Sequence, residues 1–218
     1  MKPGAAGSGV PPELKLAVLR HYEAQLRRFG PTPEGMDWKD AASQRLRFRI
    51  LCEVCDLRGL SLHEVGCGAG HLLDHLRESG IAVDYSGSDL SRAMVEAARR
   101  LHPDARFEER DLLLEAPEPS YDVVVCSGLF HVSLGRAEAE WRHFVEETLR
   151  RMWALCRVAI AFNLISDRVD WRAPTLHYSN PGETFEFCRR ELGRYTTLRH
   201  DYPLHEYTVY VYREPRVA

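Results

Sequence analysis

From Ser61 onward, short apolar runs alternate with longer segments of helical periodicity, and no other feature of the sequence restricts the fold as much. Strands that alternate with helices are typical of α/β domains, because each helix carries the chain back so that the next strand runs parallel to the last. The pattern predicts an α/β fold with a mainly parallel sheet. The expected strands are 61–65, 82–88, 105–109, 121–126 and 157–164. The expected helices are 70–79, 91–101, 136–156 and 182–192.

The chain ends in two further strand-like runs, 195–201 and 207–213. Residues 202–206 between them are too few for a crossover helix. We therefore expect these two strands to pair as an antiparallel C-terminal hairpin.

The N-terminal quarter has a different character. Residues 1–12 are mostly Gly, Ala, Ser and Pro, which bury too little apolar surface to offset their ordering entropy, so we expect a disordered tail. Apolar residues then recur at helical spacing up to Phe29, and a second helix is expected from about Asp40 to Leu57. We accordingly divide the chain into a disordered tail (1–12), a helical cap (13–58) and an α/β domain (59–218).

Charge and apolar content restrict the class of partner. The net charge is −3 and the pI is near 6.4, with arginines interleaved among acids, so no nucleic-acid footprint is visible. The longest apolar stretches, such as 158–162, are far shorter than the roughly 20 residues of a membrane span, and residues 1–4 begin no signal peptide. The six cysteines are too scattered for a secreted disulfide scaffold. We expect a cytoplasmic monomer or homodimer that binds neither membrane nor nucleic acid.

The strongest local signal is a strand that runs into three glycines and then a helix. Gly66, Gly68 and Gly70 have the spacing G-x-G-x-G. Glycine is needed where a backbone turns sharply and lets a ligand approach, because a Cβ would fill the ligand's space. The dinucleotide fingerprint G-x-G-x-x-G would need glycine in place of His71, and the phosphate-loop lysine is also missing. The motif therefore indicates either a nucleoside site that cradles no pyrophosphate or an ordinary tight turn.

Two carboxylates follow the next two expected strands. Asp89 comes about 20 residues after the glycines, where it can accept hydrogen bonds from both hydroxyls of a ribose seated on the glycine loop. Its alternative role is a helix cap, since a helical run begins just after Ser91. Asp111 can accept a hydrogen bond from the exocyclic amine of adenine, with Leu90 or Leu112 packed on the ring. Its alternative role is that of a solvated acid in a loop.

Taken together these residues resemble the class I S-adenosylmethionine-dependent methyltransferases of the small-molecule type, over most of the chain from about Trp38 to Arg213. The segments similar to family motifs are 64–70, 87–91 with Met94, 111–112 and 121–127. The resemblance implies a Rossmann-like, seven-stranded, mostly parallel sheet in which the antiparallel seventh strand is inserted between strands five and six. It also implies an N-terminal helical cap and a methyltransferase domain over residues 59–218.

The resemblance further implies S-adenosyl-L-methionine as the cofactor. Glu64 would orient its amino-acid end, and the glycines would lie beneath its ribose and methionine part. The residues implied to bind it are Glu64, Gly66, Cys67, Gly68, Gly70, Leu72, Asp89, Leu90, Met94, Asp111, Leu112 and Ser127. By analogy with the family, Trp38, Gln44 or Arg47 closes over the methionine carboxylate, which the fork of an arginine suits; a surface arginine and a hydrophobic tryptophan are the alternative.

Methyl transfer is an in-line displacement, and the departing thioether needs no proton. The protein must align the acceptor, exclude water and, for an OH or NH acceptor, take up a proton. His131, after the fourth strand, is the leading catalytic base because imidazole titrates near neutrality; its alternative role is to hold the loop. The expected acceptor contacts, after the fifth strand and in the polar, aromatic connection that follows it, are Asn163, His177 and Tyr178.

We expect methyl transfer to an O, N or C atom of a small-molecule acceptor. The alternatives are methylation of a nucleic acid or protein, aminocarboxypropyl transfer from the same cofactor, and a non-catalytic cofactor-binding subunit. Residues 126–129 lack the Asn/Asp-Pro-Pro-aromatic sequence used on exocyclic base amines. We expect no metal, because Cys52 and Cys55 have no second pair downstream and Ser127 stands where a metal-dependent enzyme of the catechol type has an acid.

Overall fold

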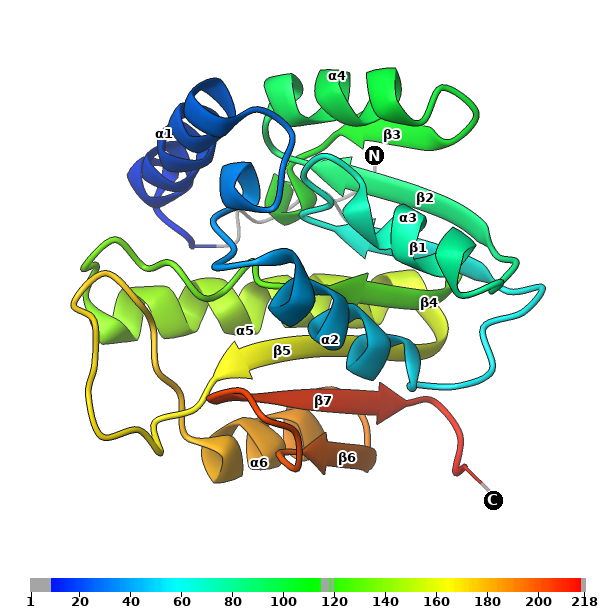
Figure 1. Cartoon of the computed structure of the whole chain (residues 1–218). Coiled ribbons are helices and arrows are strands. Elements are labelled where there is room, and N and C mark those ends of the chain that lie inside the picture. The colour runs from blue at the N-terminus through cyan, green and yellow to red at the C-terminus, as the bar shows by residue number, and fades with distance from the viewer. Residues whose placement is uncertain (1–8, 115–117, 119, 217–218) are drawn as a thin grey trace, which may run out of the picture.

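The strands form one mixed sheet in the order β3-β2-β1-β4-β5-β7-β6 (Figure 1). The computed structural model describes residues 9–114, 118 and 120–216. The strands are β1 (Ser61–Val65), β2 (Asp84–Asp89), β3 (Arg106–Glu109), β4 (Tyr121–Cys126), β5 (Cys156–Ile165), β6 (Tyr195–Arg199) and β7 (Glu206–Tyr212).

The sheet is parallel from β3 to β5 and antiparallel at its C-terminal end. β1 pairs in parallel with β2 and β4, β2 with β3, and β4 with β5. β7 runs antiparallel to both β5 and β6, and with a neighbour on each side all its residues are buried. This confirms the α/β fold, the closing hairpin, and the insertion of the last strand that the family resemblance implied.

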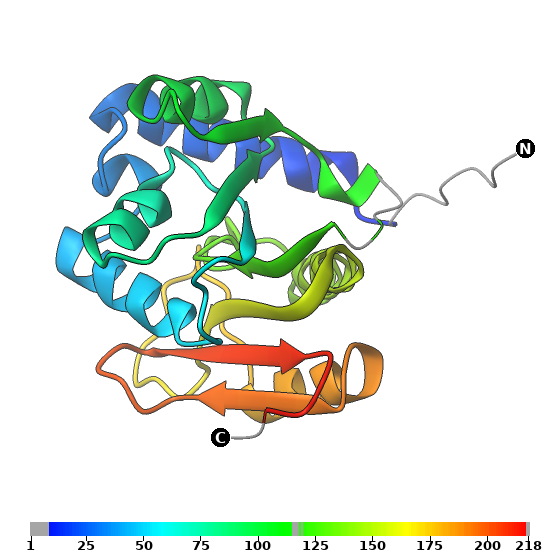
Figure 2. The same cartoon turned by 90° about the vertical axis from the view of Figure 1, so that its right-hand side faces the viewer.

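Helices cover both faces of the sheet (Figure 1, Figure 2). They are α1 (Pro12–Phe29), η1 (Glu34–Met36), α2 (Ala41–Cys52), α3 (His71–Glu78), α4 (Arg92–Leu101), η2 (Leu112–Leu114), α5 (Glu138–Leu155) and α6 (Pro181–Glu191). Residues of α1, α5 and α6 pack with Val124 and Cys126 of β4 in one core, whereas α2, α3 and α4 pack with Val123 and Val125 in the other. The carboxyl ends of the parallel strands are thereby brought together at one edge, where ligands bind in open α/β sheets.

Some element boundaries differ from the prediction. α2 ends at Cys52 rather than Leu57. The prediction was too long because Val54 and Leu57 have the spacing of a helical face and are buried, although they lie in the connection that follows the helix. At the N-terminus, Val10 is buried in the core and α1 begins at Pro12, so the folded part starts earlier than expected. The remainder of the predicted disordered tail, residues 1–8, lies outside the described residues.

In the part of the chain that the structure describes, no helix combines the length and the apolar character needed to cross a membrane.

Candidate active site

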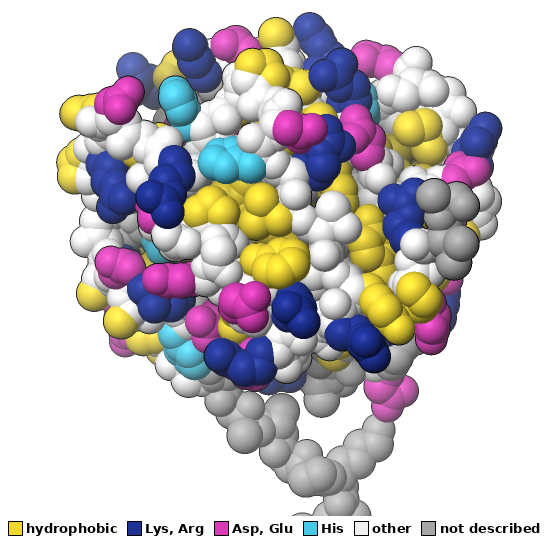
Figure 3. Space-filling model, turned by 90° about the horizontal axis from the view of Figure 1, so that it is seen from below, with side chains coloured by type: hydrophobic (Ala, Val, Ile, Leu, Met, Phe, Trp, Pro, Cys, Tyr) yellow, Lys and Arg dark blue, Asp and Glu magenta, His cyan; other side chains and the backbone are white. Residues whose placement is uncertain are grey.

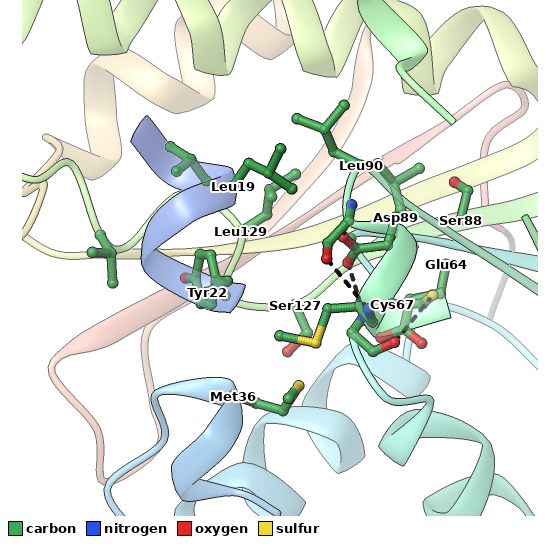
Figure 4. A pocket seen from close by; sticks show the side chains of 18 of the residues that line it. Leu19, Tyr22, Met36, Glu64, Cys67, Ser88, Asp89, Leu90, Ser127 and Leu129 are labelled. Atoms are coloured by element: carbon green, nitrogen blue, oxygen red, sulfur yellow. Dashed lines mark hydrogen bonds between the residues drawn. The ribbon is translucent and has the colours of Figure 1, made fainter. Parts of the chain in front are cut away.

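A cavity lies at the carboxyl ends of β1, β2 and β4, beneath α1 and the segment 36–38 (Figure 4). The predicted site residues that line it are Trp38, Gln44, Glu64, Gly66, Cys67, Gly68, Asp89, Leu90, Met94, Asp111, Leu112, Ser127 and His131. The predicted site residues that lie outside its lining are Arg47, Gly70, Leu72, Asn163, His177 and Tyr178. The structure thus brings most of the expected cofactor residues together with His131.

The glycine loop joins β1 to α3 through left-handed backbone. Gly68 has a φ of +53°, and a Cβ there would lie 2.6 Å from Met36 Sδ, so Met36 packs directly on the loop. The backbone N–H groups of Gly66 and Cys67 donate to the Ser88 carbonyl, at 2.8 and 3.0 Å, and so hold the loop against β2. Because only glycine combines this φ with so close a contact, the loop presents bare backbone to the cavity.

Asp89 ends β2 with its carboxylate against the glycine loop. Its Oδ2 accepts from the Gly68 N–H at 3.0 Å, and its Oδ1 accepts from the Ser91 N–H at 2.8 Å. The N-cap of α4 is Ser91, whose side chain accepts from the Met94 N–H, so Asp89 is not the cap. Burial raises the pKa of Asp89, although its backbone hydrogen bonds act in the opposite direction. Each carboxylate oxygen retains capacity for a further hydrogen bond.

Glu64 is buried at the end of β1, where the Tyr85 hydroxyl donates to its Oε2 at 2.5 Å. Burial raises the pKa of Glu64 to about 8, although the bond from Tyr85 lowers it. Glu64 is therefore mostly protonated at neutral pH, and it can donate as well as accept a hydrogen bond.

Asp111, after β3, is paired within the protein rather than solvated. Its Oδ2 forms an ion pair with Lys15 Nζ of α1, and its Oδ1 accepts from the Leu113 N–H at 3.1 Å. The pair ties α1 to the side of the cavity where Asp111 and Leu112 lie. The sequence pattern did not indicate Lys15.

Trp38 covers the loop that follows β4. Gly128 has a φ of +76°, and a Cβ there would lie 2.3 Å from Trp38 Cη2, so the indole rests on bare backbone. The Arg47 guanidinium stacks on the same indole at 4.5 Å from the ring centroid, and Arg47 therefore packs against Trp38 without lining the cavity. Gln44 is buried and pairs with His71 Nδ1 at 3.2 Å.

Glu206, which sequence reasoning missed, occupies the centre of a buried polar cluster. Its carboxylate accepts from Arg47 Nε at 2.9 Å, from Arg47 Nη2, and from Asn163 Nδ2 at 2.9 Å. Asn163 Oδ1 in turn accepts from the Gly128 N–H at 2.9 Å. Burial works to raise the pKa of Glu206, but His131 and Arg47 outweigh it, and the pKa is lowered. A carboxylate at the start of an otherwise apolar strand was the one signal in the sequence.

His131 is buried beside this cluster. Its Nε2 lies 3.8 Å from Glu206 Oε2, and its ring meets Trp38 edge-on with centroids 5.9 Å apart. Burial lowers the pKa of His131, although Glu206 raises it. The imidazole is therefore neutral at pH 7 and can accept a proton.

Three buried polar atoms in this region have no hydrogen-bond partner among the described residues: Arg47 Nη1, Ser127 Oγ and His131 Nε2. All three belong to residues next to Trp38 or Gly128. Buried polar atoms are nearly always hydrogen-bonded, so such a group of unpaired atoms indicates a ligand site. Of these three residues, Ser127 and His131 line the cavity and Arg47 does not. The Ser127 hydroxyl suits the charged amino-acid end of S-adenosylmethionine, and the bare glycine loop suits its remainder.

The connection between β5 and α6 does not contribute its predicted site residues to the cavity at the strand ends. His177 and Tyr178 line a second, polar cavity between α5 and α6, and not the cavity at the strand ends. The Tyr178 hydroxyl accepts from the Ala173 N–H at 2.9 Å, and burial lowers the pKa of His177 to about 4. The His177 backbone N–H donates to the His131 carbonyl at 2.8 Å, so this connection supports the active-site loop through its backbone.

Within the described ranges, no group of three or more His, Cys, Asp or Glu side chains is arranged to hold a metal ion.

Comparison with known proteins identifies the family. A methyltransferase-domain family model matches residues 63–157. The candidate methyltransferase Rv1506c of Mycobacterium tuberculosis is 36% identical over 157 residues, which are 69% of this chain and 92% of that relative. The chain belongs to the class I S-adenosylmethionine-dependent methyltransferases. This confirms the predicted enzyme class, and the methyltransferase uses S-adenosylmethionine as its cofactor.

The fold of this methyltransferase is also found in solved structures of other methyltransferases, among them the following two. One is the 1,6-didemethyltoxoflavin-N1-methyltransferase of Burkholderia thailandensis with bound 1,6-didemethyltoxoflavin and S-adenosylhomocysteine (TM-score 0.64, 19% identity, 97% of this chain and 92% of that one). The other is the magnesium protoporphyrin IX methyltransferase of Synechocystis PCC 6803 with S-adenosylhomocysteine (TM-score 0.63, 13% identity, 92% of this chain and 100% of that one).

Proposed function

We propose that this methyltransferase transfers a methyl group to an O, N or C atom of a small-molecule acceptor. The observation that carries the proposal is the shape of the cavity, which joins the glycine loop and Asp89 to His131 beneath α1 and Trp38. A site covered in this way suits a whole small molecule, whereas a nucleic acid would have to extrude its target base to reach it. Two structural neighbours are, by their names, methyltransferases of 1,6-didemethyltoxoflavin and of magnesium protoporphyrin IX.

Surface charge gives the same indication. Lys and Arg side chains are interspersed with Asp and Glu on the face that carries α6 and β6 (Figure 3). The net charge of −3 adds no cationic field that would attract a polyanion. We keep the division into a helical cap (13–58) and a methyltransferase domain (59–218), in which α1 and Trp38 of the cap cover the site.

The cofactor supplies a methyl group made electrophilic by its sulfonium. In the proposed site the glycine loop lies beneath its ribose and methionine part, and Asp89 accepts hydrogen bonds from the ribose hydroxyls. Asp111, although paired with Lys15, accepts a hydrogen bond from the exocyclic amine of adenine. The adenine ring packs between Leu90 and Leu112. The residues proposed to surround the amino-acid end are Trp38, Gln44, Glu64 and Ser127. Cys67 and Met94 complete the lining, while Gly70 and Leu72 act from outside it by shaping the loop and α3.

His131 is the proposed catalytic base. An acceptor OH or NH that attacks the methyl group loses its proton, and the unpaired Nε2 of His131 is the proposed proton acceptor. The carboxylate of Glu206, 3.8 Å away, would stabilise the resulting imidazolium. Asn163 supports this arrangement indirectly by holding the Gly128 N–H and the Glu206 carboxylate.

Incubation with methyl-labelled S-adenosylmethionine and a metabolite extract, followed by mass analysis, separates the proposed reaction from its alternatives. A mass gain of one methyl group on a small molecule supports the proposal. Transfer of an aminocarboxypropyl group, or label only in added nucleic acid or protein, contradicts it. Cofactor binding without any turnover would indicate a non-catalytic subunit.

Asp89→Ala tests the cofactor site. Removing a carboxylate that accepts two ribose hydroxyl bonds costs on the order of 1.5–3 kcal/mol per charge-assisted bond, so the dissociation constant for S-adenosylhomocysteine should rise about tenfold or more. Calorimetry on folded protein measures it, starting from micromolar affinity, about −8 kcal/mol, in the wild type. Asp84→Ala, at the exposed start of the same strand, is the control and should change nothing. An unchanged affinity in Asp89→Ala would assign the carboxylate to the loop alone.

A further inference from the structure

Apolar side chains from three segments form part of the cavity lining. They are Leu19 and Tyr22 of α1, Leu129 and Val132 of the loop after β4, and Phe144 of α5, and we call these five residues the apolar end. In Figure 4, Leu19 and Tyr22 lie across the cavity from Glu64 and Cys67. None of the five belongs to a cofactor motif.

The apolar end adjoins the glycine loop. A Cβ on Gly66 would lie 3.2 Å from Leu129 Cδ1, so Leu129 packs on the loop. His131, the proposed base, lies between Leu129 and Val132 in the chain and lines the same cavity. A molecule bound at these residues would therefore lie beside the proposed base and beside the loop that is proposed to hold the cofactor.

The cationic side chains of the lining already have partners. Among the described residues these cations are Lys15, paired with Asp111, and Arg110, paired with Glu108 at 3.1 Å. An anionic acceptor would enter without a free cation to meet it, and burying an unpaired charge is costly.

The acids of the lining are engaged as well. Asp37 accepts from His21 Nε2 and Gln25 Nε2, each at 2.8 Å. Asp89 accepts backbone N–H groups of the glycine loop and α4, and Glu64, with its pKa raised to about 8 by burial, is mostly neutral at pH 7. A cationic acceptor therefore finds no free carboxylate beside the apolar end.

Tyr22 supplies one polar contact. No described residue hydrogen-bonds its hydroxyl, although the side chain lines the cavity. Burial, with Asp37 and Asp89 nearby, raises its pKa above the ordinary value, so it remains a neutral phenol. It can donate or accept one hydrogen bond but cannot balance a charge.

From these contacts we infer that the acceptor is an uncharged, largely apolar molecule that occupies the apolar end and places a polar atom at the Tyr22 hydroxyl. The inference rests on the proposed function and names the class of its substrate. Its specificity comes from exclusion, since every ionised group of the lining is either paired within the protein or, as with Asp89, proposed to bind the cofactor.

Matched ring compounds that differ only in charge test the inference on the protein saturated with S-adenosylhomocysteine. The probes are 4-methylphenol, 4-hydroxybenzoate and tyramine, with 2-naphthol and 6-hydroxy-2-naphthoate as a larger pair, and ligand-observed NMR at pH 7 measures binding. The neutral member of each set should bind about tenfold tighter than its charged counterparts. Equal or tighter binding of a charged member, or no binding of either neutral compound at millimolar concentration, overturns the inference.

Variants locate the binding. Leu19→Trp fills the apolar end and should raise the dissociation constant of the neutral compounds about tenfold or more. The control Leu16→Trp makes the same substitution at a 43% exposed position on the same helix, outside the lining, and should leave binding unchanged. Tyr22→Phe is a smaller change that removes one hydrogen bond, and it should raise the dissociation constant of the neutral compounds several-fold. This variant replaces Leu19→Trp as the test if Leu19→Trp does not fold. Unchanged binding in a folded Leu19→Trp protein, or in Tyr22→Phe, contradicts the placement.

The affinity for S-adenosylhomocysteine, measured on every variant, separates the two levels of the proposal. If the wild-type protein does not bind S-adenosylhomocysteine, the proposed function itself is contradicted. A protein that binds it but prefers charged rings would overturn only the substrate class.

Discussion

Replacing Glu206 by alanine should lower the free energy of unfolding by about 3–5 kcal/mol, the cost of breaking a buried ion pair from one side. The Arg47 side chain is 12% exposed and donates to Glu206 through Nε and Nη2, while Asn163 donates its amide. Alanine would leave all these donors without an acceptor. Arginine carries a permanent charge in proteins, so the guanidinium cannot relieve this cost by becoming neutral.

Removing both charges should cost much less than removing one. In the double variant Arg47→Met, Glu206→Leu, apolar side chains of similar volume replace the pair, and such replacements are often neutral or stabilising. If Arg47→Met and Glu206→Leu each cost about 3–5 kcal/mol and the double variant costs close to nothing, the double-mutant cycle should give a coupling energy of roughly 6–10 kcal/mol. The pair is thus expected to be strongly coupled although it adds little net stability.

Urea denaturation with linear extrapolation measures these free energies, and equal m-values in all variants would show that the unfolded states are comparable. The matched control is the exposed pair of Arg106 with Asp84, with side chains 69% and 66% exposed, where Asp84→Ala should change stability by less than about 0.5 kcal/mol. A loss below about 1 kcal/mol in Glu206→Ala, or a double variant that loses the sum of the two single effects, would refute the reasoning. Glu206→Gln, which keeps the shape and one acceptor oxygen, is the substitute if the alanine variant does not fold.

Two further predictions concern histidines. His131→Ala should reduce turnover by about 10²–10⁴ and leave the affinity for S-adenosylhomocysteine unchanged, and turnover close to wild type would make His131 a structural residue. His63 is buried between Ser86 and Ser88, and burial lowers its pKa to about 3. Because the unfolded chain binds this proton near pH 6.5, the contribution of His63 to stability is present above that pH and is lost as pH falls toward 3, by up to about 1.4 kcal/mol per pH unit. Urea titrations at pH 7 and pH 5 should show a smaller loss in His63→Gln than in the wild type; equal losses would contradict the burial argument.

Most of the fold could be predicted because its signals are local. Alternating strands and helices identify a parallel sheet, and the short connection before β7 requires a hairpin. The end of α2 was wrong because Val54 and Leu57 keep helical spacing and are buried, yet in a turn. Periodicity reports which residues are buried, and it cannot tell a last helical turn from a tight turn with the same buried face.

The site has two parts, the residues at the strand ends and the long-range pairs formed with the N-terminal helices, and the sequence indicates only the first part. The glycine loop, Asp89 and Asp111 lie at the carboxyl ends of successive strands, so their spacing along the chain reflects their position in space. Lys15 and Asp111 are 96 residues apart, and Arg47 and Glu206 are 159 residues apart. No local pattern can indicate such pairs, because they depend on how the cap and the last hairpin pack against the domain. For the same reason His177 and Tyr178, chosen from their loop, lie in a different cavity.

Trp38 connects these two parts physically. It rests on Gly128, stacks with Arg47, and meets His131 edge-on, while Arg47 is held by Glu206. A side chain at Gly128 would displace the indole, and with it the packing of both Arg47 and His131. Residues in contact rarely have additive effects, whereas distant ones usually do. Substitutions at Trp38 or Gly128 are therefore expected to affect cofactor affinity and turnover together, whereas Asp89→Ala and Leu19→Trp, which lie outside this contact, are expected to separate cofactor binding from acceptor binding.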